Sequence, residues 1–173
     1  MKLKIGQTIV ISNHNLTEID GETYTEEQLL KMNTIKVKDL NLSNMKLVAL
    51  PKWVKKCEVQ EDFNCVLNRL TTLEGAPKIV KGDFNCSGNN LNLLKGASKT
   101  VGGDFYCSGN NLIPLKGAPR TVGGDFYCAG NRLTTLEGAP KIVKGDFYCY
   151  NNKKKFTEED VNAVSKVKGN VKV

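Results

Sequence analysis

Five cysteines recur at a constant interval of 21 residues, and a thiol can bind a metal, form a disulfide or act as a nucleophile. They are Cys65, Cys86, Cys107, Cys128 and Cys149. A line of equivalent sites lacks the close C-x-x-C spacing that gathers ligands around a zinc ion or an iron–sulfur cluster. A catalytic thiol needs an activating base, and the only histidine, His14, lies far from this array in the sequence. We therefore expect no metal, no cofactor and no catalytic cysteine.

Two identical strings reveal the tandem repeat that carries these cysteines. TTLEGAPKIVKGDF occupies residues 71–84 and recurs at residues 134–147, three periods of 21 residues later. Each unit keeps the order F-x-C-x-x-N-x-L-x-x-L. In one unit these positions are Phe105, Cys107, Asn110, Leu112 and Leu115. Because self-similarity at a fixed period is the signature of stacked repeats, the sequence predicts a solenoid with one coil per unit.

Each coil should combine a short parallel strand with an irregular return arm. Phe105 and Cys107 are two residues apart, so on a strand both side chains point into the coil. Asn110 follows where the chain must turn, and its amide can bond backbone groups of the turn or of a neighbouring coil. The segment KGAP at 116–119 contains glycine and proline without helical periodicity. This composition favours turns or extended chain over an α-helix.

The pattern resembles the leucine-rich repeat, L-x-L-x-x-N-x-L-x-x-L, with Phe and Cys in the first two leucine positions. The match covers residues 62–136 without a gap, and units such as GDFYCAGNRLTTLEGAPKIV (124–143) are similar to those of short bacterial and bacteriophage proteins of this family. The resemblance implies a parallel β-sheet on the concave face and few helices, limited to the two ends. It also implies a non-catalytic module that binds another protein.

The strand position also bears on whether the cysteines form disulfides. Stacked strands would place equivalent Cα atoms about 4.8 Å apart, within the range that a disulfide can span. Five equivalent thiols cannot pair evenly, however, and parallel side chains suit the bond poorly. We therefore expect free thiols that fill the core as small hydrophobic groups.

An aspartate column should face outward, immediately before the strands. Its members are Asp62, Asp83, Asp104, Asp125 and Asp146. Like charges in neighbouring rows repel, so we expect each carboxylate to accept backbone N–H groups of the preceding glycine turn. The alternative is a stripe that binds a basic partner or a cation.

Beside the aspartates, otherwise similar repeats change from asparagine to tyrosine along the chain. This column is Asn64, Asn85, Tyr106, Tyr127 and Tyr148, and the next column ends at Tyr150. Tyrosines on a rigid sheet supply contact area with little loss of entropy, which makes them candidates for binding a partner. The hypothesis assigns binding to Tyr106, Tyr127, Tyr148 and Tyr150, with Asp83, Asp104, Asp125 and Asp146 selecting a basic patch. The alternative is that the rings pack edge to edge and only cover the sheet.

A basic column lies on the return arm. Its members are Lys78, Lys99, Arg120 and Lys141. It could follow phosphates, but no aromatic residues flank it, so the stacking of single-stranded bases is unsupported. The net charge of +7 is spread as +2, +2 and +3 over residues 1–60, 61–150 and 151–173, which argues against one dedicated polyanion-binding arm. We interpret the column as a solvated face and do not expect nucleic acid as a partner.

The sequence divides into an N-terminal cap (1–60), the repeats (61–152) and a C-terminal cap (153–173), because a solenoid must cover its open core at both ends. In the first cap, residues 39–54 and 9–19 each keep the core spacing irregularly and would form two degenerate coils. A hairpin is the alternative for the earlier of these.

Each cap also carries a helix signal. TEEQLLKM predicts a short helix with a capping box between Thr25 and Gln28, and the alternative hairpin would turn at Asp20-Gly21. In the second cap, Thr157 should begin a helix. The apolar stripe of that helix would cover the last coil and consists of Val161, Val164 and Val167.

The remaining signals concern location and activity. The apolar run at the start is broken by Gln7 and Thr8, and no run approaches the length of a membrane span. We therefore expect a cytoplasmic protein, in the host cytoplasm if a phage encodes it, with no membrane partner. The chain has no nucleotide-binding loop, Ser-His-Asp order or metal-ligand cluster, so we do not expect an enzyme.

The function expected is that of a small adaptor or inhibitor that binds a partner protein through its concave face, with a host or defence protein as a plausible target. Two alternatives remain. One is binding of nucleic acid or another polyanion through the basic return arm and Lys153, Lys154 and Lys155. The other is self-association through an uncovered end of the solenoid.

Overall fold

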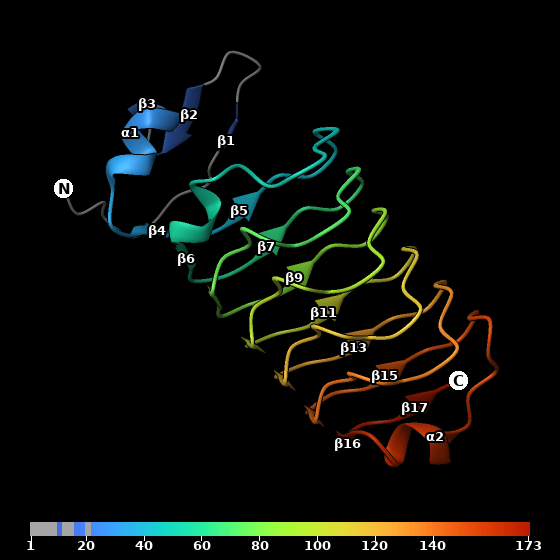
Figure 1. The fold of residues 1–173 in the computed structure, drawn as a ribbon. Coiled ribbons are helices and arrows are strands. Elements are labelled where there is room, and N and C mark those ends of the chain that lie inside the picture. The colour runs from blue at the N-terminus through green and yellow to red at the C-terminus, as the bar shows by residue number, and fades with distance from the viewer. Residues whose placement is uncertain (1–9, 12–15, 20–21) are drawn as a thin grey trace.

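The computed structural model describes residues 10–11, 16–19 and 22–173. From residue 35 onward the chain winds into a parallel β-solenoid of about seven turns, which confirms the predicted stack of 21-residue coils (Figure 1). Two parallel sheets of seven strands each run along the stack. Equivalent positions of successive coils pair with one another, as when Phe105 pairs with Phe84 and Phe126. The register is therefore the sequence repeat itself.

The first sheet contains the predicted F-x-C strands. In spatial order they are β5 (Leu40–Asn41), β7 (Phe63–Asn64), β9 (Phe84–Asn85), β11 (Phe105–Tyr106), β13 (Phe126–Tyr127), β15 (Phe147–Tyr148) and β17 (Val171–Lys172). The hydrogen bonding continues beyond each short strand, since Cys107 N donates to Tyr127 O at 2.8 Å. Each coil thus adds one extended segment to a continuous ladder.

The return arm contains extended chain, as predicted, but it is regular there and not irregular, because it carries the second parallel sheet. Its strands are β4 (Ile35–Val37), β6 (Cys57–Val59), β8 (Ile79–Val80), β10 (Thr100–Val101), β12 (Thr121–Val122), β14 (Ile142–Val143) and β16 (Lys166–Val167). β-Branched residues dominate these strands and favour extended backbone. Most are only two residues long, which is too short for an alternating pattern to show in the sequence.

The core lies between the two sheets and repeats from coil to coil. Fully buried phenylalanines form a ladder of Phe63, Phe84, Phe105, Phe126 and Phe147. Neighbouring ring centroids lie 4.8 to 5.8 Å apart. Because burial of such a side chain contributes about 1.5–3 kcal/mol, the ladder is a principal source of stability.

A second ladder, of asparagines, joins the turns. The Asn89 amide donates to the carbonyls of Cys65 and Cys86 at 3.0 and 3.1 Å, and its oxygen accepts the N–H of Leu70 at 3.0 Å. Asn110 and Asn131 repeat these contacts one and two coils later. The predicted role of this amide in bonding both its own turn and a neighbouring coil is confirmed.

At the N-terminal end a hairpin replaces the first of the two predicted coils. β2 (Leu16–Ile19) pairs antiparallel with β3 (Glu22–Thr25), and β1 (Val10–Ile11) pairs with β2. The interpretation of residues 9–19 as a coil was therefore wrong, although Ile9 and the turn at Asp20-Gly21 lie outside the described residues.

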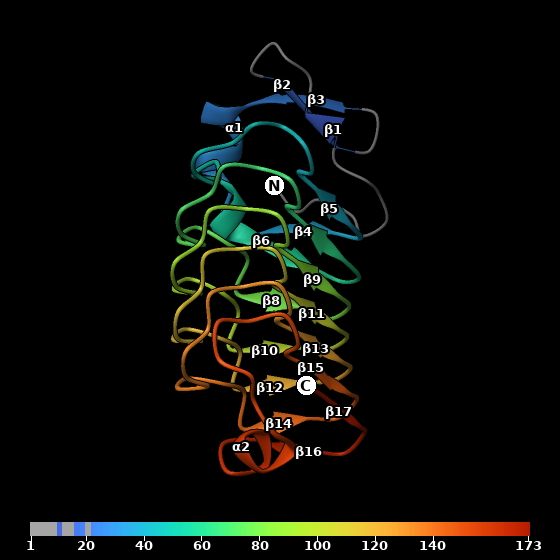
Figure 2. The same cartoon turned by 90° about the vertical axis from the view of Figure 1, so that its right-hand side faces the viewer.

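Among the described residues, three short helical segments complete the ends. α1 (Glu26–Lys31) has the predicted capping box between Thr25 and Gln28, and the 3₁₀ segment η1 (Val54–Lys56) precedes β6. α2 (Glu158–Asn162) lies at the opposite end of the stack from α1 (Figure 2). None of the described helices has the length and apolar character needed to cross a bilayer.

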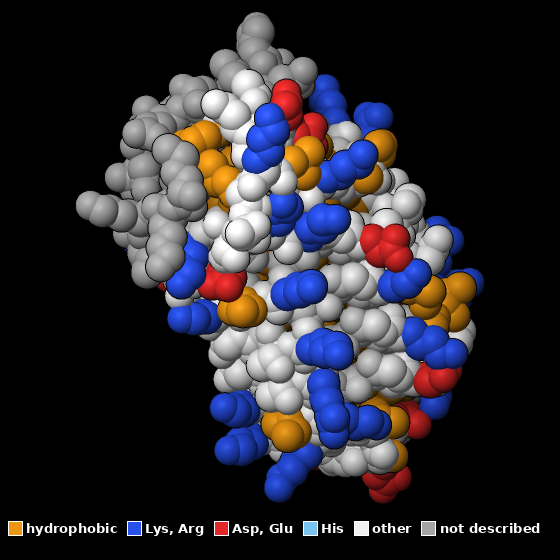
Figure 3. All heavy atoms as spheres, turned by 60° about the vertical axis from the view of Figure 1, so that its left-hand side comes forward, with side chains coloured by type: hydrophobic (Ala, Val, Ile, Leu, Met, Phe, Trp, Pro, Cys, Tyr) orange, Lys and Arg blue, Asp and Glu red, His pale blue; other side chains and the backbone are white. Residues whose placement is uncertain are grey.

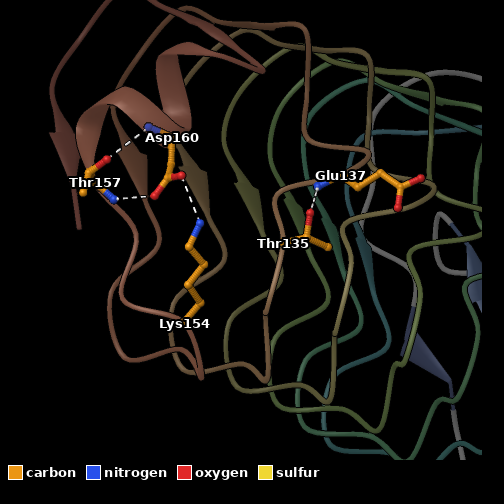
Figure 4. Close-up of polar contacts among 5 residues, drawn as sticks. All are labelled: Thr135, Glu137, Lys154, Thr157 and Asp160. Carbon is orange, nitrogen blue, oxygen red and sulfur yellow. Dashed lines mark hydrogen bonds and ion pairs between the residues drawn. The ribbon is translucent and has the colours of Figure 1, made fainter.

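α2 begins where predicted but ends early. The Thr157 hydroxyl accepts the backbone N–H of Asp160 at 3.2 Å, and the Asp160 carboxylate accepts the backbone N–H of Thr157 at 3.0 Å (Figure 4). Lys154 forms an ion pair with Asp160 at 3.0 Å. The same figure shows a turn in which Thr135 Oγ1 accepts the N–H of Glu137 at 3.1 Å.

Of the predicted valine stripe, only Val161 is on this helix. Val164 follows the helix and Val167 lies on β16. The chain thus leaves α2 to add one more coil, because VKGN at 167–170 repeats VKGD at 143–146.

Candidate partner-binding site

The predicted aspartates lie at the corner between the two sheets, where they form an aspartate ladder. Asp104 Oδ1 accepts the backbone N–H of Asp125 at 2.7 Å. The equivalent bonds join Asp39 to Asp62, Asp62 to Asp83, Asp83 to Asp104, and Asp125 to Asp146. The carboxylates do accept backbone N–H groups, but the donor is the next aspartate and not the preceding glycine turn. The column is therefore a structural element of the stack.

A glycine precedes Asp83, Asp104, Asp125 and Asp146 and makes room for this ladder. A Cβ atom placed on Gly124 would lie 2.0 Å from Asp104 Oδ1, and one on Gly145 would lie 2.0 Å from Asp125 Oδ1. A side chain at these glycines would displace the carboxylate of the coil before, whereas Glu61 occupies the equivalent position at the first rung, where the bond from Asp62 N to Asp39 is longer, at 3.1 Å. The recurring Gly-Asp pair of the repeat is thus explained by the close approach of consecutive coils.

The tyrosines are anchored to the aspartates. The Tyr106 hydroxyl donates to Asp104 Oδ2 at 2.7 Å, and the Tyr127 hydroxyl donates to Asp125 Oδ2 at 2.9 Å. The Tyr148 hydroxyl reaches Asp146 at 3.2 Å. Each of these carboxylates therefore bonds the backbone of the next coil and the tyrosine of its own coil.

The three rings form one stack. The centroids of Tyr106 and Tyr127 are 4.6 Å apart with an interplanar angle of 8°, and those of Tyr127 and Tyr148 are 4.3 Å apart with an angle of 9°. All three side chains are half-buried on the first sheet. The rings thus stack face to face, not edge to edge. We call this surface, with the aspartate ladder beside it, the tyrosine face.

The surroundings of the hydroxyls disfavour the phenolate. Partial burial and the hydrogen bond to Asp104 raise the pKa of Tyr106 above its usual value. The corresponding burial and the bond to Asp125 raise the pKa of Tyr127. The tyrosines therefore remain neutral hydrogen-bond donors at neutral pH, which suits contact more than chemistry.

Tyr150 is separate from the stack. Its side chain is 45% exposed, two residues beyond Tyr148, and it borders a hollow of about 290 Å³ that Lys155 and Phe156 also line. In three earlier coils asparagine (Asn41, Asn64 and Asn85) replaces the stacked tyrosine, and Asn85 Oδ1 accepts the N–H of Ser87 at 3.0 Å instead. The aromatic surface is therefore confined to the C-terminal half of the stack.

The cysteines lie inside the coils. All six are free and buried. Each of three thiols donates its S–H to a backbone carbonyl of the next coil. Cys107 donates to Tyr127 O at 3.2 Å, Cys86 to Tyr106 O at 3.3 Å and Cys128 to Tyr148 O at 3.3 Å. Burial raises the pKa of Cys57 to about 12 and that of Cys149 to about 11. These thiols are packing groups. Over the described part of the chain, no cluster of three His, Cys, Asp or Glu side chains could hold a metal ion.

The predicted basic column lies immediately before strands of the second sheet. Lys78, Lys99, Arg120 and Lys141 precede β8, β10, β12 and β14, and we call them the basic row. Figure 3 shows Lys and Arg side chains following one another along this face. The row is thus held in register by a sheet.

The sequence reasoning missed both ends of the aspartate ladder. Asp39 begins it, and Asn170 ends it by donating its backbone N–H to Asp146 Oδ1 at 2.7 Å. The signals were present, since Asp39 precedes Leu40 as Asp62 precedes Phe63, and since VKGN resembles VKGD.

Comparisons of the chain with models of protein families, with curated proteins and with solved structures find no match.

Proposed function

We propose that this chain is a non-catalytic leucine-rich-repeat module that binds a partner protein through the tyrosine face. The observation that carries the proposal is the ring stack of Tyr106, Tyr127 and Tyr148, in which every hydroxyl is held by an aspartate of its own coil. The rings are restrained before any partner arrives. Binding would therefore lose little side-chain entropy, and such pre-organisation favours affinity.

The chemistry of the face suits a partner segment that carries cations beside apolar carbon. Aromatic rings attract Lys and Arg side chains, and the adjacent carboxylates attract the same charge. Asp83, Asp104, Asp125 and Asp146 would select such a segment, and Tyr150 would extend the contact toward the C-terminal hollow. The resemblance to bacteriophage-type repeats directs the search for this partner toward a host or defence protein.

The test exploits the chain's own variation, because asparagine already occupies the tyrosine position in three coils. The triple variant Y106N/Y127N/Y148N should fold and should fail to capture a partner that the wild type captures from a lysate of the source cells. A triple Tyr→Phe variant keeps the rings and should retain that partner. Capture of the same protein by the asparagine variant at equal yield would contradict the proposal.

A further inference from the structure

The basic row crosses four successive coils on the second sheet without compensating anions. All four side chains are exposed, and none belongs to an ion pair within the described residues. Their backbones are consecutive rungs of one ladder, since Arg120 N donates to Lys99 O at 2.7 Å and Lys141 N donates to Arg120 O at 2.9 Å. Four positive charges therefore stand in line along the axis of the stack.

Another charged column of the same coils, in contrast, contains ion pairs between its own members. Glu74, Lys95, Lys116 and Glu137 occupy equivalent positions, so that each lysine has a glutamate on one side and the other lysine on the other side. Lys95 binds Glu74 at 2.7 Å and Lys116 binds Glu137 at 2.9 Å. Like charges on neighbouring rows of a sheet destabilise it, and that column relieves the repulsion internally. The basic row has no such relief.

The aspartate ladder forms no ion pair with the row, although it lies only five residues further along each coil. Oδ1 of each aspartate is directed to the backbone of the next coil, and Oδ2 of Asp104, Asp125 and Asp146 is directed to a tyrosine on the first sheet. The positive and negative columns thus serve different faces. The ammonium and guanidinium groups of the row are therefore open to an external anion.

We propose that the basic row binds the phosphate backbone of a nucleic-acid duplex. The charges form a line and not a disc, which fits a linear polyanion. With strands about 4.8 Å apart, the row spans about 14 Å. That length is less than half of a turn of B-form DNA, about 34 Å, so the row can contact one strand over part of a turn without bending the duplex. The described strands of this sheet carry no aromatic side chain, so single-stranded bases would find nothing there on which to stack.

The surface continues beyond Lys78 at the N-terminal end of the row. A hollow of about 460 Å³ lies there, and its lining includes Lys55, Lys78, Ile79 and the acidic Glu58. Glu58 already pairs with Lys36 at 3.9 Å. Lys56 also lines the hollow, but its ammonium group donates to the carbonyls of Leu30 and Met32 and is already engaged. Lys55 therefore offers a further cation beside the row. The contacts would be independent of base sequence, because Lys and Arg on phosphates carry no sequence information.

The experiment measures binding of the full chain to a short fluorescein-labelled DNA duplex by fluorescence anisotropy. Four phosphate contacts predict that affinity falls about 10²-fold between about 50 and 200 mM salt. The variant K78Q/K99Q/R120Q/K141Q should lose this salt-dependent binding at the lower salt concentration. The matched control K95Q/K116Q/K153Q/K155Q removes the same number of charges from exposed positions outside the row and should retain it.

Several outcomes would overturn the assignment. They are absence of binding by the wild type at low salt, equal losses in the row variant and the control, and tighter binding of a single strand than of the duplex. Binding to vesicles of phosphatidylserine and phosphatidylcholine without binding to DNA would assign the row to a membrane surface instead. Circular dichroism of each variant excludes misfolding as the cause of a loss. The row and the tyrosine face share no residue, so this test and the capture experiment succeed or fail separately.

Discussion

Asp104 and Tyr106 are joined by a hydrogen bond of 2.7 Å, in which the hydroxyl donates to Oδ2 while Oδ1 holds the backbone of Asp125. A single carboxylate therefore stabilises the stack and orients a surface ring. The same arrangement at Asp125 and Asp146 makes stability and the proposed binding surface depend on common residues. Mutations can separate the two roles.

Removal of the Tyr106 hydroxyl should lower the free energy of unfolding less than removal of the Asp104 carboxylate. We expect Y106F to lower the free energy of unfolding by about 0.5–1.5 kcal/mol, since it deletes one hydrogen bond. D104A deletes the tyrosine contact and also leaves the N–H of Asp125 without this acceptor. We therefore expect it to lower the free energy of unfolding by about 1–3 kcal/mol. Urea unfolding measures both. Y150F, on an exposed ring, is the control and should change stability by less than about 0.5 kcal/mol.

The glycine before each of Asp83, Asp104, Asp125 and Asp146 should be coupled energetically to the aspartate of the previous coil. A Cβ on Gly124 would meet Asp104 Oδ1 at 2.0 Å, so we expect G124A to destabilise by about 1–3 kcal/mol. In a D104A background the clashing atom is absent, and the same change should cost less. A double-mutant cycle by urea unfolding gives the coupling directly. Additive effects would show that the clash is relieved in another way.

Two aspartates of the ladder should give stability opposite dependences on pH. The backbone N–H of Asn170 lowers the pKa of Asp146, so its contribution is fully present above the unfolded pKa of about 3.9 and is lost as pH falls through the lower folded pKa. Burial raises the pKa of Asp83, with repulsion from Asp104 and Asp62 adding to it. The folded chain then takes up this proton first, so stability rises as pH falls through the folded pKa of Asp83.

Urea unfolding over a series of pH values distinguishes the two carboxylates. D146N should flatten the loss of stability in acid. D83N should stabilise the chain at neutral pH, because its amide oxygen can still accept the N–H of Asp104 without a charge. An unchanged acid slope in D146N would show that this carboxylate is not held as the structure indicates.

The buried thiols should resist alkylation while the chain is folded. Burial raises the pKa of Cys57 to about 12, whereas that of Cys149 rises only to about 11, and Cys149 borders the C-terminal hollow. Because the thiolate is the reactive form, we expect Cys149 to react with iodoacetamide before the other five, and all six to react in urea. Mass spectrometry of digests reports the order. Early labelling of Cys107 instead would indicate that the central coils open.

The C-terminal end of the stack should not associate with other copies. β16 and β17 are edge strands, and three lysines lie on or between them: Lys166, Lys168 and Lys172. Lysine on an edge opposes pairing with another strand. We expect a constant mass over a wide concentration range by light scattering, and association in the variant K166V/K168V/K172V. Concentration-dependent growth of the wild type would favour the self-association hypothesis.

The repeat made much of the stack predictable. Phe105, Cys107 and Leu112 were assigned to the interior from their spacing, and Asn110 was assigned to the turn, because every coil must place the same side chain in the same environment. The two capping residues, Thr25 and Thr157, were found for a similar reason, since capping is a local interaction within four residues. The second sheet was missed because two residues such as Thr121-Val122 carry no periodic signal.

What the sequence determined by itself is therefore whatever depends on the period and on contacts close along the chain: the solenoid, its core positions and the starts of its helices. What only the tertiary structure decided depends on which groups of neighbouring coils meet. The donor to Asp104, the stacking of Tyr106 on Tyr127 and the alignment of the basic row each join residues 21 positions apart. A sequence states that such residues are equivalent, but only the close approach of consecutive coils makes an amide, a ring or a charge the neighbour of its own counterpart.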